Sequence, residues 1–141
     1  MPARPGAYAI KAALADPGAA VFELQAQKTM YGGKHVAAGD TVYVFHSENG
    51  GGTGLVARGV VVAAEPVPPR PGIERRTPCV HVTVRCTARA RRPLGRRELK
   101  PHADWDDGRP ETELNFKFYR QATDKIVGLS VGAAAFLDGC F

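Results

Sequence analysis

Long apolar runs are absent from the sequence. No stretch approaches the ~20 apolar residues that a membrane-spanning helix needs, so we expect a protein without membrane segments. The start of the chain, MPARPGAYAIKAALADPG, is basic, but Lys11 interrupts its weakly apolar, alanine-rich part. A secretory signal needs a continuous apolar segment at that point, and we therefore assign this stretch to the fold itself.

Cysteine is also scarce. The three cysteines, Cys79, Cys86 and Cys140, have no metal-binding spacing, and their odd number does not suit a disulfide framework. Such a set is typical of small buried or half-buried thiols in a reducing compartment. We therefore expect a cytoplasmic protein without disulfide bonds.

Motifs of common enzyme sites are missing as well. Neither a Gly-x-Ser-x-Gly motif nor a Ser-His-Asp set is visible. The segment 102–107 offers imidazole and carboxylate groups, but their spacing matches no standard metal site. The sequence therefore predicts no catalytic residue, no metal and no cofactor, and it favours a protein without catalysis.

A glycine-rich stretch, with four glycines in the five positions Gly50–Gly54, lacks the other parts of a phosphate-binding loop. Such a loop needs a Lys-Ser/Thr pair and then a helix whose free amides face the anion. Here the glycines lead instead into a strand rich in β-branched residues. We interpret them as a mobile hairpin tip, where positive backbone dihedrals cost little.

Positive charge is present in excess and is unevenly placed. The formal net charge is +5, and basic proteins attract polyanions, of which nucleic acid is the commonest. Arginines and lysines are concentrated between residues 85 and 100, and an acidic stretch follows at 104–113. Two interpretations of this basic run therefore stay open: a solvated charged loop, or a patch that contacts phosphates. The run consists of Arg85, Arg89, Arg91, Arg92, Arg96, Arg97 and Lys100.

Five segments have the residue pattern of β-strands. In the segment 79–86, three valines alternate with polar residues. In the segment 55–64, Gly59 predicts a bulge or a sharp bend. The segment 20–27 fits a helix or a strand equally well. Ser130 predicts the N-cap of a last helix that ends at Gly139. The five strand segments are Ala7–Leu14, Thr41–His46, Leu55–Ala64, Cys79–Cys86 and Glu113–Gln121.

Because strands outnumber helices and do not alternate with them, a parallel α/β sheet is disfavoured. The sequence predicts a mainly β, α+β fold, namely a small mixed or antiparallel β-barrel with peripheral helices. Its length of 141 residues predicts one domain over residues 1–141.

One stretch resembles a known family. AAGDTVYVFHSENGGGTGLVARGVVVAAEPV is similar to the core motif of the EVE domains, in the PUA-like group that includes the ASCH and YTH domains. In that motif a Gly-Asp turn opens a strand, a glycine-rich stretch leads to a second strand, and a proline-containing loop follows. The resemblance covers residues 38–67. It implies a PUA-like barrel that binds DNA or RNA, often through a modified base, in a concave site at the barrel mouth.

A flipped base needs an aromatic surface and polar groups that read its edge, and its flanking phosphates need cations. The candidate stacking residues are Tyr31, Trp105 and Tyr119. The candidate edge readers are His46, Ser47, Asn49 and Gln121. The candidate phosphate contacts are Lys34, Arg58, Arg89, Arg91, Arg92, Arg96, Arg97 and Arg120.

Several of these candidates have a structural alternative that the sequence leaves open. Trp105 can cap the core, and His46 shares a strand face with two valines, as a core histidine does. Arg58, in an apolar strand, can pair with a carboxylate such as Glu48 or Asp40.

Two other functions remain as alternatives. Some ASCH-type relatives are amidohydrolases of acylated nucleosides that use Lys, Thr and Glu, and here Lys28-Thr29, Lys34 and Glu48 occur in that order. A catalytic lysine would need a pKa lowered by burial. The third possibility is a protein-interaction module that docks through the basic segment 76–100.

Overall fold

The computed structural model describes residues 7–47, 54–67, 78–92, 94–102, 104, 106–119 and 125–141. Within these residues, six strands form a closed barrel with the spatial order β1-β3-β4-β5-β2-β6. β1 runs parallel to β3 and β2 parallel to β6, whereas the other neighbours are antiparallel. The predicted small mixed barrel is therefore confirmed. The strands are β1 (Ala7–Ala12), β2 (Val21–Met30), β3 (Thr41–His46), β4 (Gly54–Pro66), β5 (Cys79–Arg89) and β6 (Lys125–Leu129).

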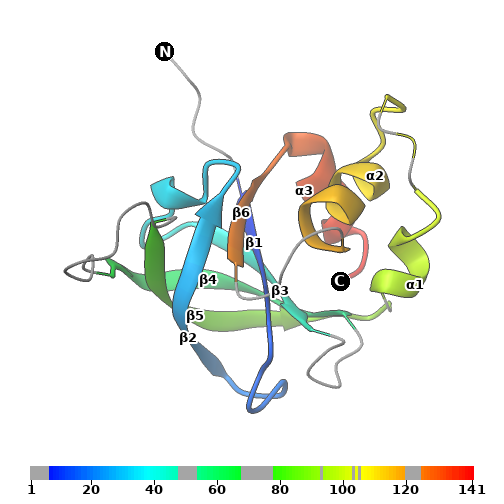
Figure 1. Cartoon of the computed structure of the whole chain (residues 1–141). Helices are drawn as coiled ribbons and strands as arrows, with labels where there is room; N and C mark the ends of the chain where they lie inside the picture. The colour runs from blue at the N-terminus through cyan, green and yellow to red at the C-terminus, as the bar shows by residue number, and fades with distance from the viewer. Residues whose placement is uncertain are drawn as a thin grey trace.

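Short helices cover one side of this barrel. Figure 1 shows α1, α2 and α3 together on the same side of the strands. A π-helical turn, η3, continues α2 directly, and a 3-10 turn, η1, connects β2 to β3. The bounds are η1 (Gly33–His35), α1 (Arg96–Leu99), α2 (Pro110–Leu114), η3 (Asn115–Tyr119) and α3 (Val131–Asp138). No helix of the described chain is long and apolar enough to cross a membrane.

The core has two parts, which lie on opposite faces of the same strands. One fills the barrel interior and draws buried residues such as Ile10, Val44 and Val82 from all six strands. The other lies between the outer faces of β1, β3 and β6 and the helices, with Phe45 and Leu137 among its members. Because side chains alternate along a strand, strands that separate the two parts are apolar on both faces.

Several local predictions are confirmed. Val80, Val82 and Val84 of β5 are buried, whereas the residues between them are only half-buried. The β4–β5 register shifts between Arg58 and Gly59, as the glycine predicted. The Ser130 side chain accepts a hydrogen bond of 3.1 Å from the Ala133 amide, so it is the N-cap of α3. The open segment 20–27 lies almost wholly in β2.

The strand predicted at Glu113–Gln121 is wrong. Residues 113–119 form the end of α2 and the turn η3, and residues 120 and 121 lie outside the described part. Pro110 at the first helical turn begins this helix, because its fixed φ suits that position. Glu113 and Lys117 then meet at 3.0 Å as an i,i+4 ion pair, a spacing that belongs to a helix and not to a strand.

The close approach at Gly59 leads to a test of this fold. A Cβ at position 59 would lie 2.4 Å from the carbonyl oxygen of Arg85 and 2.6 Å from a methyl carbon of Val84. We expect Gly59→Ala to lower the free energy of unfolding by about 1–3 kcal/mol, the usual cost of overpacking. Urea denaturation measures this change.

Gly132→Ala is the matched control. A Cβ there meets nothing closer than 3.9 Å, and alanine in a helix costs less than glycine, by up to about 1 kcal/mol. The control should leave the stability unchanged or raise it. Equal losses in the two variants would contradict the close packing of β4 on β5.

Candidate functional site

Two lysines are buried opposite one another on neighbouring strands. Lys11 of β1 and Lys125 of β6 are a cross-strand pair, and they are only 3% and 1% exposed. By strand alternation Lys125 lies on the same face as Val127 and Leu129, which is the face that the helices cover. Among the described residues, the Lys125 ammonium has no hydrogen-bond partner.

This burial changes the acidity of Lys125. Removal from water penalises the charged form, and the positive charge of Lys11 acts in the same direction. Together they lower the pKa of Lys125 to about 8. An amine of this kind is still largely protonated at neutral pH, but it gives up its proton far more readily than a surface lysine.

Ser47 directly follows β3, the strand next to β1. Its amide donates to the carbonyl oxygen of Ala12 at 2.9 Å, which extends the β1–β3 ladder by one residue. Strand alternation then puts Ser47 on the face of the sheet that Lys11 occupies. Ser47 is 1% exposed, and within the described residues its hydroxyl has no partner.

These groups form a buried polar cluster, which we define as Lys11, Lys125 and Ser47. A buried polar group without a partner costs about 1–3 kcal/mol, so the Lys125 ammonium and the Ser47 hydroxyl, which bond to no described residue, lower the stability of the free protein. A ligand that supplies hydrogen-bond acceptors would remove this cost. Phe45, opposite Lys11 in the β1–β3 pairing and fully buried, gives the cluster an apolar neighbour.

His46 points elsewhere. It alternates with Ser47 and shares the face of Val42 and Val44, which line the barrel interior. Its Nε2 atom is buried and has no partner in the described part of the chain. His46 therefore lies on the opposite face of the sheet from the polar cluster, in the core-facing position that the sequence left open.

Tyr31, which directly follows β2, lies at a separate cavity of about 220 Å³. Its carbonyl oxygen accepts a hydrogen bond from the Gly128 amide at 3.1 Å, and its ring is 5.0 Å from the Lys117 ammonium. The cavity is lined by Tyr31, Gly108, Arg109, Thr112, Glu113, Phe116 and Lys117.

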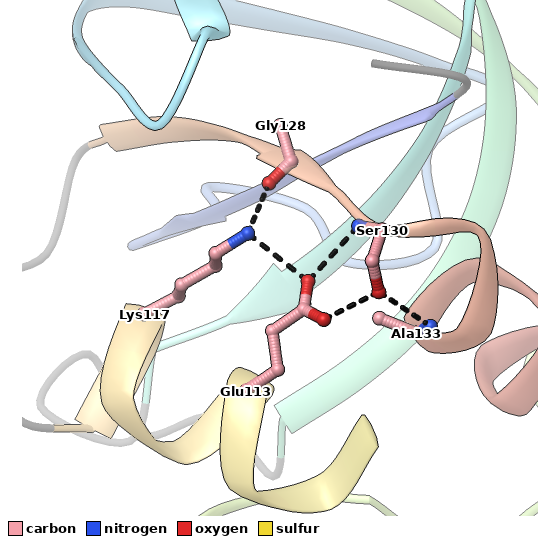
Figure 2. Close-up of polar contacts among 5 residues, drawn as sticks. All are labelled: Glu113, Lys117, Gly128, Ser130 and Ala133. Carbon is pink, nitrogen blue, oxygen red and sulfur yellow. Dashed lines mark hydrogen bonds and ion pairs between the residues drawn. The ribbon is translucent and has the colours of Figure 1, made fainter. Parts of the chain in front are cut away.

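A carboxylate fixes the helix layer beside this cavity. Figure 2 shows Glu113 between Lys117 and Ser130. The carboxylate accepts from the Lys117 ammonium and from the Ser130 amide, both at 3.0 Å, and from the Ser130 hydroxyl. Lys117 also donates to the Gly128 carbonyl oxygen at 2.6 Å. Burial by itself raises the pKa of Glu113, but the hydrogen bonds from Ser130 and Lys117 outweigh it, and the pKa lies below its ordinary value.

Arg58 has a structural partner, although neither of the two carboxylates considered from the sequence. Its guanidinium lies 2.9 Å from the Asp138 carboxylate of α3 and 4.9 Å from the ring centre of Phe141. The Tyr43 hydroxyl donates to the same carboxylate, and burial, followed by the Asp138 contact, raises the pKa of Tyr43. This network fastens α3 to the barrel.

Arg89 is also committed to the fold. Its guanidinium donates to three carbonyl oxygens of the β1–β2 turn, at 2.8, 2.6 and 2.6 Å. Other predicted phosphate contacts, Lys34, Arg91, Arg92 and Arg97, are exposed. The remaining candidates lie outside the described residues or have no described side chain: Asn49, Arg96, Trp105, Tyr119, Arg120 and Gln121.

The lysines considered for hydrolysis are not buried. Lys28 and Lys34 are exposed, and the Thr29 hydroxyl donates to the Pro78 carbonyl oxygen at 2.7 Å. Glu48 lies outside the described part. Among the residues that the structure places, no group of three or more His, Cys, Asp or Glu is arranged to hold a metal ion.

Two solved human structures have the same fold as this chain. The chain superposes on the human THYN1 protein in complex with 5-methylcytosine containing DNA, with a TM-score of 0.61, 16% identity, and coverage of 92% of this chain and 93% of the other. For the DUF55 domain of human thymocyte nuclear protein 1, the TM-score is 0.59, the identity 15%, and the coverage 92% and 95%. The chain therefore shares the fold of these two proteins, a small barrel of the kind that the sequence motif implied.

Sequence comparison alone finds no relative. Neither a protein-family model nor a curated protein sequence matches the chain.

The Glu113 contacts predict how stability depends on pH. Because the pKa of Glu113 in the folded protein is lowered from its ordinary value of 4.5, its contribution to stability is present above that value and is lost as pH falls through the folded pKa. We expect Glu113→Gln to lower the free energy of unfolding at pH 7 by about 1–3 kcal/mol. It should also flatten the loss of stability in acid, measured by urea denaturation between pH 3 and 7.

Glu111→Gln on the same helix is the control, because its carboxylate bonds to no described residue. This variant should retain both the stability and the pH profile. An unchanged profile in Glu113→Gln would show that the carboxylate does not hold the helix layer.

Proposed function

We propose that the protein is a nucleic-acid binding module that holds one modified or flipped base of DNA or RNA at the buried polar cluster. The observation that carries this proposal is a pair of buried groups on the helix-covered face of the barrel, the Lys125 ammonium and the Ser47 hydroxyl, neither of which has a partner among the described residues. A protein of the same fold was solved with 5-methylcytosine containing DNA, which supports a base as the ligand.

The chemistry of the cluster suits the edge of a pyrimidine. The carbonyl oxygen and ring nitrogen of cytosine accept hydrogen bonds, and an ammonium and a hydroxyl donate them. Because these donors are buried, leaving them unpaired is costly, and a site of this kind discriminates strongly between ligands that do and do not satisfy it.

An apolar neighbour supports a preference for methylated cytosine. Phe45 is opposite Lys11 in the β1–β3 pairing, so an apolar substituent of the base would meet an aromatic surface next to the donors. Burying one methyl group contributes about 1 kcal/mol, or roughly five-fold in Kd.

The surface supplies the sequence-independent part of binding. Arg91, Arg92 and Arg97 are exposed, and the formal net charge is +5. Contacts of these cations with phosphates release counterions, so this part of the affinity falls as salt rises. Hydrogen bonds to a buried base respond less to salt, and salt therefore separates the two contributions.

Binding to short oligonucleotides tests the proposal. We expect single-stranded DNA or RNA with 5-methylcytosine to bind more tightly than the unmodified sequence, and the preference to persist at high salt. Ser47→Ala and Lys125→Met should each weaken binding about 10-fold or more, because each removes a buried hydrogen-bond donor. Fluorescence anisotropy at two salt concentrations measures these affinities.

Lys100→Met is the control, because it removes the same charge from an exposed position. It should weaken binding slightly and equally for both oligonucleotides. The proposal is wrong if Lys125→Met and Lys100→Met behave alike and neither changes the preference for the modified base.

A further inference from the structure

We propose that Lys125 is a nucleophile that forms a Schiff base with an aldehyde-bearing nucleobase held at the buried polar cluster. This inference rests on the proposed function, since an aldehyde reaches the buried amine as part of a bound base. It adds a covalent reaction, and a class of substrate, to a site otherwise assigned to binding alone.

The position of Lys125 supplies the first requirement of such a nucleophile, an amine that no counter-ion holds in its charged form. Lys125 is 1% exposed, and its Nζ atom bonds to none of the described residues. A carboxylate partner would stabilise the ammonium and suppress attack by the amine. Within the described chain, Lys125 has no such partner.

The neighbours of Lys125 supply the second requirement, a site that favours the neutral amine. Lys11 faces it across β1 and Lys28 pairs with it across β2, so the residues opposite it on both neighbouring strands are basic. Desolvation and an adjacent cation are the two means by which proteins activate a lysine for imine formation. With its pKa at about 8, roughly a tenth of Lys125 is neutral at pH 7.

The reaction balances without an oxidant or a reductant. The Nζ lone pair attacks the aldehyde carbon and forms a C–N bond, while a proton passes from nitrogen to the carbonyl oxygen. The resulting carbinolamine loses water and leaves an imine. In this proposal the Ser47 hydroxyl, buried on the same face of the sheet and without a described partner, donates a hydrogen bond to the carbonyl oxygen as it becomes charged.

The ligand class follows from the proposed function, in which the base at the cluster is a modified cytosine. A formyl group at carbon 5 of cytosine has nearly the shape of the methyl group at that position, so a site that accepts 5-methylcytosine also accepts 5-formylcytosine. The methylated base has no aldehyde with which an amine can form an imine and is only bound, whereas the formylated base brings an aldehyde to the amine.

Reductive trapping tests the inference. The full chain is incubated with oligonucleotides that carry cytosine, 5-methylcytosine or 5-formylcytosine, and sodium cyanoborohydride then converts any imine into a stable amine. We expect a covalent adduct with the formyl oligonucleotide alone, and peptide mass spectrometry should place it on Lys125. Lys125→Met and Lys125→Arg should each reduce the adduct at least about 10-fold, whereas Lys100→Met should retain it.

The outcomes separate this inference from the function on which it rests. If the 5-methylcytosine oligonucleotide binds and the formyl oligonucleotide gives no adduct, Lys125 is not a nucleophile, and the binding proposal stands. An adduct spread over exposed lysines such as Lys28 and Lys34, at the level given by urea-unfolded protein, also overturns the inference. If none of the three oligonucleotides binds, both proposals fall.

Discussion

All six residues of β1, Ala7–Ala12, are buried, because the even-numbered side chains face the barrel interior and the odd-numbered ones face the helix layer. A charged residue in such a strand has no solvated side to which it can turn. Lys11 is therefore held inside the protein, opposite Lys125 of β6, and Ser47 extends the neighbouring ladder on the same face. The polar cluster is buried because β1 is covered on both faces, by the barrel interior and by the helix layer.

The helix layer makes this burial possible, and two polar networks hold it in place. At one end, Glu113 ties α2 to the N-terminus of α3 through Ser130, and Lys117 extends the network to the Gly128 carbonyl oxygen of β6. At the other end of α3, Asp138 receives hydrogen bonds from Tyr43 and Arg58 of the barrel. Both networks satisfy their charged groups within the fold. Two donors of the polar cluster differ from them, because the Lys125 ammonium and the Ser47 hydroxyl bond to no described residue.

Much of the barrel was predictable from the sequence, because β3, β4 and β5 have clear apolar patterns and Gly59 marks the bend that they need. The site was only partly predictable. Ser47 lies in the recognised motif, and Lys11 was visible as a charge within an apolar stretch. Lys125 had no signal, since β6 was not recognised as a strand. The partner of Arg58 is 80 residues away, and no local pattern indicates such a contact.

In the proposed function, a base provides a partner for the Lys125 ammonium, which is buried and bonds to none of the described residues. NMR titration of the Lys125 side chain, with and without a 5-methylcytosine oligonucleotide, tests it most directly. We expect the pKa of Lys125 to be about 8 in the free protein. It should rise clearly when the oligonucleotide binds, because a hydrogen-bond acceptor stabilises the ammonium. An ordinary lysine pKa in the free protein, or a lowered value that the oligonucleotide leaves unchanged, would contradict it.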